Sequence, residues 1–182
     1  MGKVFCIGMF KTGTSTMGAV FQCLGYQTLN GPWWPKDIMI FDDWYKTPEK
    51  WNNYRDVIKN KTEQYDAFQD YPWMFCFEMC YEWYPDAKFI FSSRDSEKVA
   101  DSDINMWRKE GVPEDKILDR QVFIDRYENQ YNRAIEFFKD KPGSLLVLGI
   151  TENPGCDEIC KFLNKPVPNI PFPHTNKGVY RV

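Results

Sequence analysis

The sequence predicts an α/β fold, specifically a three-layer α/β/α sandwich with a central parallel sheet. Short apolar runs with the character of buried strands alternate with segments of helical periodicity along the chain. The first apolar run is followed by a turn rich in glycine and hydroxyl residues and then by a helical segment, which is typical of a parallel βα unit. With 182 residues and no internal repeat or low-complexity linker, we expect one domain spanning residues 1–182.

In the first half of the chain, turn and cap residues define where each element stops. Gly25 is suited to end a helix in the left-handed conformation, Pro48 suits the first position of a helix, and Pro72 follows the end of a strand. The expected elements, in order, are a strand over 3–8, a helix over 17–24, a short strand over 26–29, a helix that begins at 47–49, a strand over 65–69 and a helix over 73–84.

The second half repeats the alternation and ends in a proline-rich tail. Residues 114–140 form a long amphipathic pattern, which predicts one continuous helix. The expected elements are a strand over 87–93, helices over 96–109 and 114–140, a strand over 144–149 and a helix over 156–163.

Composition excludes several classes of protein. The net charge of −3 argues against a general nucleic-acid surface, so any anion site must be a local basic pocket. No apolar run approaches the roughly 20 residues of a membrane span, and no signal peptide precedes the first strand, so we expect a cytoplasmic protein with reduced thiols. Two pairs of cysteines, 76/80 and 156/160, are four positions apart, which places the members of each pair on one face of a helix. They are expected to be small buried hydrophobic residues rather than zinc ligands.

The segment 8–16, Gly-Met-Phe-Lys-Thr-Gly-Thr-Ser-Thr, is the most informative part of the sequence. Free backbone N–H groups and the positive end of a helix dipole at such a strand–turn–helix junction predict a cradle for phosphate or sulfate. The segment is not a Walker A loop, because Lys11 precedes Gly13 by two residues instead of following it. The lysine therefore meets a bound anion at a different point.

Chemically useful residues also follow the later strands. Ligands of parallel sheets bind at the carboxyl ends of the strands, where Asp70, Arg94 and, farther along a helix, Ser102 are expected to converge on the cradle. Arg94 can fork two N–H groups to a second phosphate, to which Ser102 adds a hydroxyl. The alternatives are that Asp70 caps the following helix and that Arg94 forms a surface ion pair with Asp95.

An aromatic segment, residues 30–54, separates the two parts of the predicted sheet. It is irregular in pattern and contains Trp33, Trp34, Phe41, Trp44, Tyr45, Trp51 and Tyr54. These side chains either pack in the core or form the wall of an apolar acceptor pocket, and their number favours the pocket.

At these residues the chain resembles a known family. Residues 11–15 look like the 5′-phosphosulfate loop of sulfotransferases that use 3′-phosphoadenosine-5′-phosphosulfate (PAPS), and Arg94 with Ser102, eight residues later, resembles that family's 3′-phosphate element. Small sulfotransferase-like P-loop proteins also have the Asp-x-Pro of residues 70–72 and the Phe-Pro-His-x-Asn tail of residues 172–176. The resemblance implies a P-loop NTPase-like fold. His174, the sole histidine of the sequence, is expected to be a structural residue that packs the tail over the crevice rather than a base.

The resemblance implies a role for each matching residue. Lys11 is expected to neutralise charge on the bridging oxygen as the S–O bond breaks, and Asp70 stands where related enzymes keep the base that accepts a proton from the acceptor. The residues implied to bind the PAPS donor are Lys11, Thr12, Gly13, Thr14, Ser15, Thr16, Arg94 and Ser102. The implied acceptor is a small molecule with a hydroxyl or amine, and no metal is required.

Two other functions remain open from the sequence. One is a non-catalytic protein with the same fold. It would bind PAPS or its product 3′-phosphoadenosine-5′-phosphate (PAP), or would act as an interaction protein. The absence of the late Gly-x-x-Gly-x-x-Lys segment of cytosolic sulfotransferases favours it. The other is a P-loop nucleotide kinase, against which the position of Lys11 argues.

Overall fold

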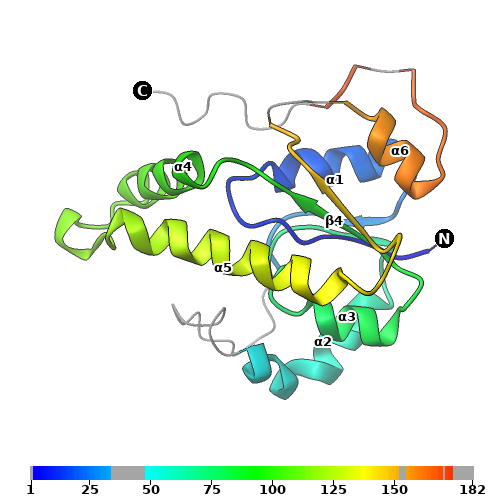
Figure 1. Ribbon diagram of the computed structural model, residues 1–182, viewed down its shortest axis with the longest axis horizontal. Helices are drawn as coiled ribbons and strands as arrows, with labels where there is room; N and C mark the ends of the chain where they lie inside the picture. Colours follow the sequence, from blue (N-terminus) through cyan, green and yellow to red (C-terminus); the bar gives the residue numbers. More distant parts are fainter. Residues whose placement is uncertain (1, 34–47, 152–154, 170, 174–182) are drawn as a thin grey trace.

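The computed structural model describes residues 2–33, 48–151, 155–169 and 171–173. Helices and strands alternate along these residues (Figure 1). In chain order the elements are β1 (Val4–Cys6), α1 (Thr14–Cys23), β2 (Thr28–Leu29), the 3₁₀ helix η1 (Pro48–Tyr54), α2 (Arg55–Thr62), β3 (Ala67–Phe68), α3 (Phe77–Trp83), β4 (Lys88–Ser92), α4 (Ser96–Lys109), the 3₁₀ turn η2 (Glu114–Lys116), α5 (Arg120–Phe138), β5 (Leu145–Leu148) and α6 (Asp157–Leu163).

The strands form one sheet in the order β2-β3-β1-β4-β5, and every neighbouring pair in it is parallel. Figure 1 shows α1 and α6 on one face of this sheet and α2, α3 and α5 on the other. The predicted α/β/α sandwich with a central parallel sheet is therefore confirmed.

Alternate residues of the strands belong to separate cores on the two faces. In β1, Phe5 packs into the core beneath α3 and α5, where its ring stacks on Phe68 at 4.7 Å and on Phe89 at 5.2 Å. Val4 and Cys6 pack into the core under α1 and α6. Because side chains of a strand alternate between faces, a strand covered on both sides must be apolar at nearly every position.

Two expected helices are shorter than their patterns predict. The pattern over 114–140 divides into η2 and α5, since Ile117 adopts an extended conformation between them and packs with its neighbour Leu118 against Ala100 and Phe123. The helix expected over 73–84 begins only at Phe77, because the preceding residues form turns that place Trp73 in the core. In both places tertiary packing of apolar side chains overrides local helical preference.

The described part of the aromatic segment packs in the core. Trp51 is fully buried against Tyr71 and Phe75, and Trp33 stacks on Trp73 with ring centroids 6.0 Å apart. For these residues core packing, the alternative to a pocket wall, is correct. The remaining aromatic residues of the segment, at 34, 41, 44 and 45, lie outside the described residues, as do His174 and the end of the tail.

The cysteines form no disulfide. Cys76, Cys80 and Cys160 are buried, as predicted, whereas Cys156 is half-buried and Cys23 is exposed. In the described ranges, no helix is both long and apolar enough to cross a membrane.

Candidate anion-binding site at the strand ends

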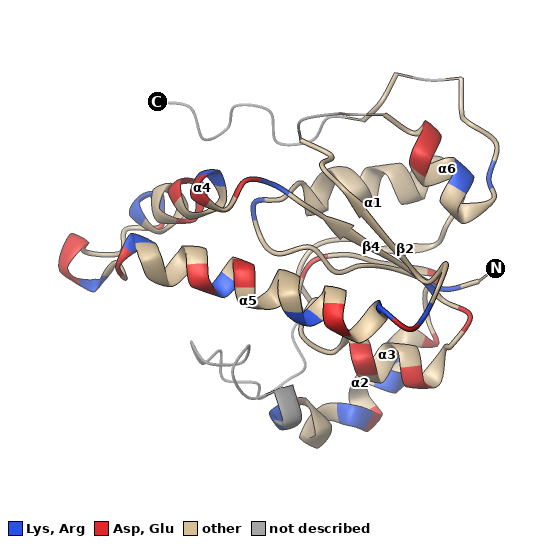
Figure 2. Ribbon diagram, viewed as in Figure 1, with Lys and Arg blue, Asp and Glu red and all other residues tan. Residues whose placement is uncertain are grey.

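The sheet order brings three loops together. Since β1 lies between β3 and β4, the turn after β1 is flanked by Asp70, which follows β3, and by Arg94, which follows β4. The cradle, Asp70 and Arg94 therefore gather at one edge of the sheet, as predicted. In Figure 2 the α1 ribbon carries neither acidic nor basic residues, so the cations here come from the loops.

The cradle itself has an unusual backbone. Lys11 has φ 65° and Gly13 has φ 96°, both in the left-handed region, and α1 begins directly afterwards at Thr14. An L-residue such as lysine adopts this conformation at a cost of roughly 1–2 kcal/mol, which a fold retains where surrounding contacts enforce it. A Cβ on Gly13 would lie 2.5 Å from Cγ2 of Ile150, so the turn also needs glycine for space.

The N-terminus of α1 is suited to an anion. Gly13, its N-cap residue, has no side chain and so makes no capping hydrogen bond to the first turn. Backbone N–H groups of a first helical turn have no partner within the helix and, together with the helix dipole, attract negative charge. Of the predicted hydroxyl contributors, Ser15 is half-buried, whereas Thr14 and Thr16 are buried.

Thr12 faces the interior rather than the open side of the cradle. Its hydroxyl donates to the Met9 carbonyl at 2.6 Å and lies 2.7 Å from Oγ of Ser92, which in turn lies 3.6 Å from Sγ of Cys6. A threonine hydroxyl has one hydrogen, so the Ser92 hydroxyl must donate to Thr12. This buried chain of polar groups ties the turn to β4, and Gly8 has to lack a side chain because a Cβ there would lie 2.1 Å from the Ser92 hydroxyl.

Asp70 lies next to the cradle in a left-handed conformation, with φ 71°. Its Oδ1 accepts a hydrogen bond from the Tyr71 N–H at 2.9 Å, and its Oδ2 accepts one from the Thr14 hydroxyl at 3.3 Å. Burial raises the pKa of the Asp70 carboxyl, while these two hydrogen bonds and the charge of Lys11 lower it. Asp70 is not the cap of the next helix, since α3 begins seven positions later at Phe77.

Arg94 connects the end of β4 to the cradle. Its Nη1 donates to the Lys11 carbonyl at 2.9 Å, and its backbone N–H donates to the Tyr127 hydroxyl at 3.1 Å. A hollow of about 450 Å³ beside it is lined by Tyr127 and Tyr131 of α5. The fork of Arg94 is thus held against the cradle rather than in the surface ion pair with Asp95, which instead caps α4 by accepting from the Lys98 N–H at 3.0 Å. Ser102 lies half-buried in α4.

Asp103 was not anticipated from the sequence. Burial lowers the pKa of the Lys11 ammonium, and the carboxylates of Asp103, Glu110 and Asp70 oppose that shift, with Asp103 contributing most. The one signal in the sequence was its position beside Ser102 in a helix that follows a strand end. Within the described part of the chain, no three His, Cys, Asp or Glu side chains are arranged to hold a metal ion.

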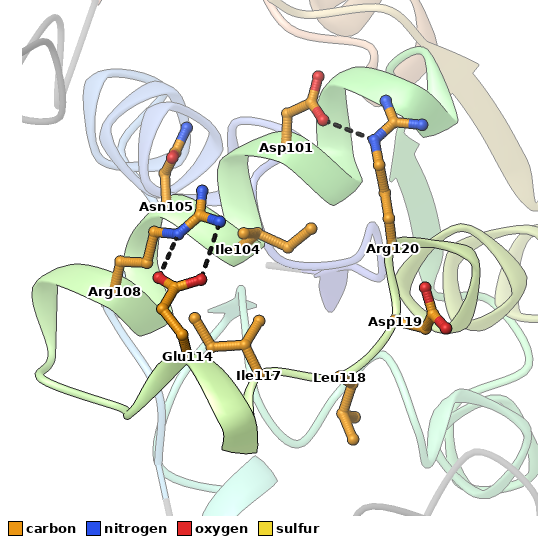
Figure 3. Close-up of a pocket in the computed structure, with 9 residues that line it drawn as sticks. All are labelled: Asp101, Ile104, Asn105, Arg108, Glu114, Ile117, Leu118, Asp119 and Arg120. Atoms are coloured by element: carbon orange, nitrogen blue, oxygen red, sulfur yellow. Dashed lines mark hydrogen bonds and ion pairs between the residues drawn. The ribbon is translucent and has the colours of Figure 1, made fainter.

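A second, larger hollow lies away from the cradle. It has a volume of about 690 Å³ and is bounded by α4, η2 and the start of α5 (Figure 3). Its arginines already have acidic partners, Arg108 with Glu114 and Arg120 with Asp101, each at 2.7 Å. These pairs offset the positive charge of the hollow, and the carboxylate of Asp119 at the start of α5 lines it too, so it is less suited to an anion than the cradle.

Comparisons with known proteins agree with this fold. A family described as a sulfotransferase domain matches residues 3–113 and 104–179. Among solved structures, the chain resembles "Sulfotransferase Domain from the Curacin Biosynthetic Pathway" with a TM-score of 0.57 and 16% identity, over 93% of this chain and 75% of that one. At this identity the likeness shows a shared fold. No curated protein sequence matches the chain significantly.

Proposed function

Because this chain belongs to the sulfotransferase domain family, we propose that it transfers a sulfuryl group from PAPS to a hydroxyl or amine of a small acceptor. The observation that supports this most directly is the hydrogen bond from Arg94 to the Lys11 carbonyl. It puts a second cation, from a different strand end, beside the anion cradle. A donor with phosphates at both the 5′ and 3′ positions needs two such adjacent sites.

In this proposal the cradle binds the 5′ end of the donor. Backbone N–H groups at Gly13 and in the first turn of α1, with the hydroxyls of Ser15 and Thr16, hold the 5′-phosphate, and Lys11 meets the bridging oxygen. Thr12 contributes indirectly, by fixing the turn from inside. Arg94 and Ser102 hold the 3′-phosphate, because a guanidinium fork and a hydroxyl both donate to phosphate oxygens.

The chemical step is an in-line displacement at sulfur. The acceptor oxygen or nitrogen forms a new bond to sulfur, the bond from sulfur to the 5′-phosphate oxygen breaks, and PAP leaves. Asp70 takes the proton that the acceptor loses, and Lys11 stabilises the negative charge that develops on the leaving oxygen. Burial raises the pKa of the Asp70 carboxyl, and a carboxylate with a raised pKa is a stronger base than one with the usual pKa of aspartate.

One observation favours a non-catalytic PAP-binding protein instead. Both carboxylate oxygens of Asp70 already accept hydrogen bonds, from Tyr71 and Thr14, which lowers their basicity. Asp70→Asn distinguishes the two functions. An enzyme keeps its PAP affinity and loses turnover by about 10²-fold or more, whereas a binding protein shows no turnover before or after the change.

Calorimetry with PAP tests the proposal. We expect the wild type to bind PAP more tightly than AMP, without dependence on Mg²⁺, and Arg94→Ala to lose about 10- to 100-fold in PAP affinity, as for one or two charge-assisted hydrogen bonds. Arg94→Lys is the matched control, since it keeps the charge and loses the fork, and should recover only part of the loss. Equal affinity for PAP and AMP would contradict the 3′-phosphate site and with it the choice of donor.

A further inference from the structure

Arg94 lies just beyond the part of β4 that the neighbouring strands pair with. The residue before it, Ser93, donates its N–H to the Leu148 carbonyl of β5 at 2.8 Å. Because successive N–H groups of a strand point to opposite sides, the Arg94 N–H points towards the side of β1. The last residue of β1 is Cys6, which pairs with Ile90, and the chain then turns into the cradle. The Arg94 N–H is therefore a donor beyond the end of the strand that it would pair with.

Tyr127 of α5 supplies the acceptor for this donor. Its hydroxyl oxygen accepts from the Arg94 N–H at 3.1 Å, across 33 positions of the chain. The Tyr127 ring is 6% exposed, packs edge-on against Phe91 with centroids 6.2 Å apart, and stacks on Tyr131 at 6.4 Å. Close packing holds such a ring in one rotamer, so the hydroxyl is a fixed point on the side of the cradle.

The side chain of Arg94 is held at its other end by the cradle. Its Nη1 donates to the Lys11 carbonyl at 2.9 Å. One residue is thus anchored twice, through its backbone to α5 and through its guanidinium to the turn after β1. The hollow of about 450 Å³ beside it is lined by Arg94 and by Tyr127, so the two residues face the same space.

We propose that Tyr127 is a positioning residue for recognition of the 3′-phosphate: by accepting from the Arg94 N–H it sets where the guanidinium fork lies beside the cradle. The inference rests on the proposed function, in which Arg94 binds the 3′-phosphate of the donor. Tyr127 lies outside the motifs that carry the sequence resemblance, and its role follows from the contact between α5 and the end of β4.

The physical argument concerns the geometry of the fork. Two parallel N–H groups of a guanidinium bind two phosphate oxygens only at a suitable distance and angle. A displacement of about 1 Å in a positioning group is enough to weaken such an arrangement severely. An anchor on the Arg94 backbone limits this displacement before the ligand arrives, so less ordering is left to oppose binding.

A purely structural role for Tyr127 predicts a different result. In that case its hydroxyl would only satisfy a partly buried N–H, and its loss would lower stability without regard to which nucleotide the folded protein binds. AMP differs from PAP in lacking the 3′-phosphate. The ratio of PAP affinity to AMP affinity therefore separates positioning of Arg94 from general support of the fold.

Tyr127→Phe is the central test, because it removes the hydroxyl and keeps the ring. By calorimetry we expect PAP affinity to fall by about 5- to 10-fold, as for one hydrogen bond, with AMP affinity within about twofold of wild type. Tyr131→Phe is the matched control, since it removes a hydroxyl from the same helix and the same hollow without touching the Arg94 N–H. Its affinities for both nucleotides should stay within about twofold of wild type.

A double-variant cycle tests whether Tyr127 acts through Arg94. When Arg94→Ala has already removed the fork, adding Tyr127→Phe should change PAP affinity by less than about twofold. A loss as large as in the wild-type background would show that the Tyr127 hydroxyl acts on the ligand by another route, and would overturn the inference.

Amide hydrogen exchange on the wild type gives a readout that needs no variant to fold. We expect exchange of the Arg94 N–H to be slowed by about tenfold or more relative to an unstructured peptide, because Tyr127 accepts from it. Exchange at the peptide rate would contradict the anchor directly.

The remaining outcomes separate this inference from the function on which it rests. Unchanged PAP affinity in Tyr127→Phe, or equal losses for PAP and AMP, would show that Tyr127 does not position Arg94, while the preference of the wild type for PAP leaves the proposed function intact. A wild type with equal affinity for PAP and AMP would instead refute the 3′-phosphate site and the proposed donor.

Discussion

Thr12→Val tests whether the cradle is held from inside. The substitution preserves the shape of a β-branched side chain and removes the hydroxyl that donates to the Met9 carbonyl and accepts from Ser92. The Met9 carbonyl and the Ser92 hydroxyl then lose this partner in a buried site, since Thr12 and Ser92 are both 0% exposed.

The magnitude follows from two lost hydrogen bonds. Each contributes about 0.5–1.5 kcal/mol, and an unsatisfied buried group adds to the loss, so we expect the free energy of unfolding to fall by about 2–3 kcal/mol. That is a large part of the 5–15 kcal/mol typical of a folded domain. The PAP affinity of the folded fraction should change by less than about threefold, because the N–H groups of α1 remain in place.

Urea denaturation followed by PAP calorimetry at low temperature measures both effects. Thr28→Val is the control, since its half-buried hydroxyl donates one bond of 3.1 Å to Tyr26 and should cost under about 1 kcal/mol. A Thr12→Val protein with wild-type stability and a more than tenfold loss of PAP affinity would refute the reasoning, because it would place that hydroxyl on the ligand. A cycle with Ser92→Ala should give a coupling of about 1 kcal/mol between the two positions.

Three further predictions concern stability. Gly8→Ala should lower the free energy of unfolding by about 1–3 kcal/mol, because its Cβ would meet the Ser92 carbonyl at 2.5 Å. Gly18→Ala in α1 meets side chains alone, Oδ1 of Asn30 at 2.3 Å and Cγ of Gln69 at 3.2 Å, and gains helix propensity, so it should cost less. Thermal denaturation compares the two variants, and equal losses would contradict the steric argument. Arg133→Ala should lower the free energy of unfolding in urea by about 3 kcal/mol or more, because it leaves the partly buried carboxylate of Glu78 without its two hydrogen bonds at 2.7 and 2.5 Å. Arg55→Ala, which breaks an exposed pair with Glu82, should lower it by under about 1 kcal/mol. Similar losses in the two variants would show that burial of the pair is unimportant. The pKa of the Asp103 carboxyl is raised from 3.8 to about 6, so the folded protein is stabilised by the protonated carboxyl below about pH 4 and loses this stabilisation as the pH rises through 6. Relative to Asp103→Asn, the free energy of unfolding of the wild type should fall by up to about 3 kcal/mol over that range. Parallel pH profiles of unfolding for the two proteins would disprove this prediction.

The elements follow most directly from the sequence where local signals agree. The helix expected over 96–109 matches α4 (Ser96–Lys109), which begins after an aspartate that caps its first turn. The cradle was also predictable, because a buried strand, a glycine turn and a helix are neighbours in the chain and their backbone geometry is set locally. Cap residues and strand patterns operate within a few residues, and the sequence displays them directly.

Packing of apolar residues produced the differences. Nothing in the pattern of residues 114–140 marks the extended segment at Ile117, which forms because its side chain joins a cluster under α4 and α5. Similarly, the aromatic character of Trp51 is compatible with a pocket or a core, and only its contacts with Tyr71 and Phe75 decide for the core. Such choices depend on partners that are distant in sequence.

The sequence by itself determined the class of fold and the strand–turn–helix cradle after β1, because both follow from residues adjacent in the chain. The tertiary structure alone decided what surrounds the cradle: that Thr12 turns inward to Ser92 and that Arg94 donates to the Lys11 carbonyl across 83 positions. The physical reason is that strand order sets which loop ends meet and how far each polar group is removed from water. Burial and charge at those meeting points then determine which side chains support the fold and which are available for chemistry.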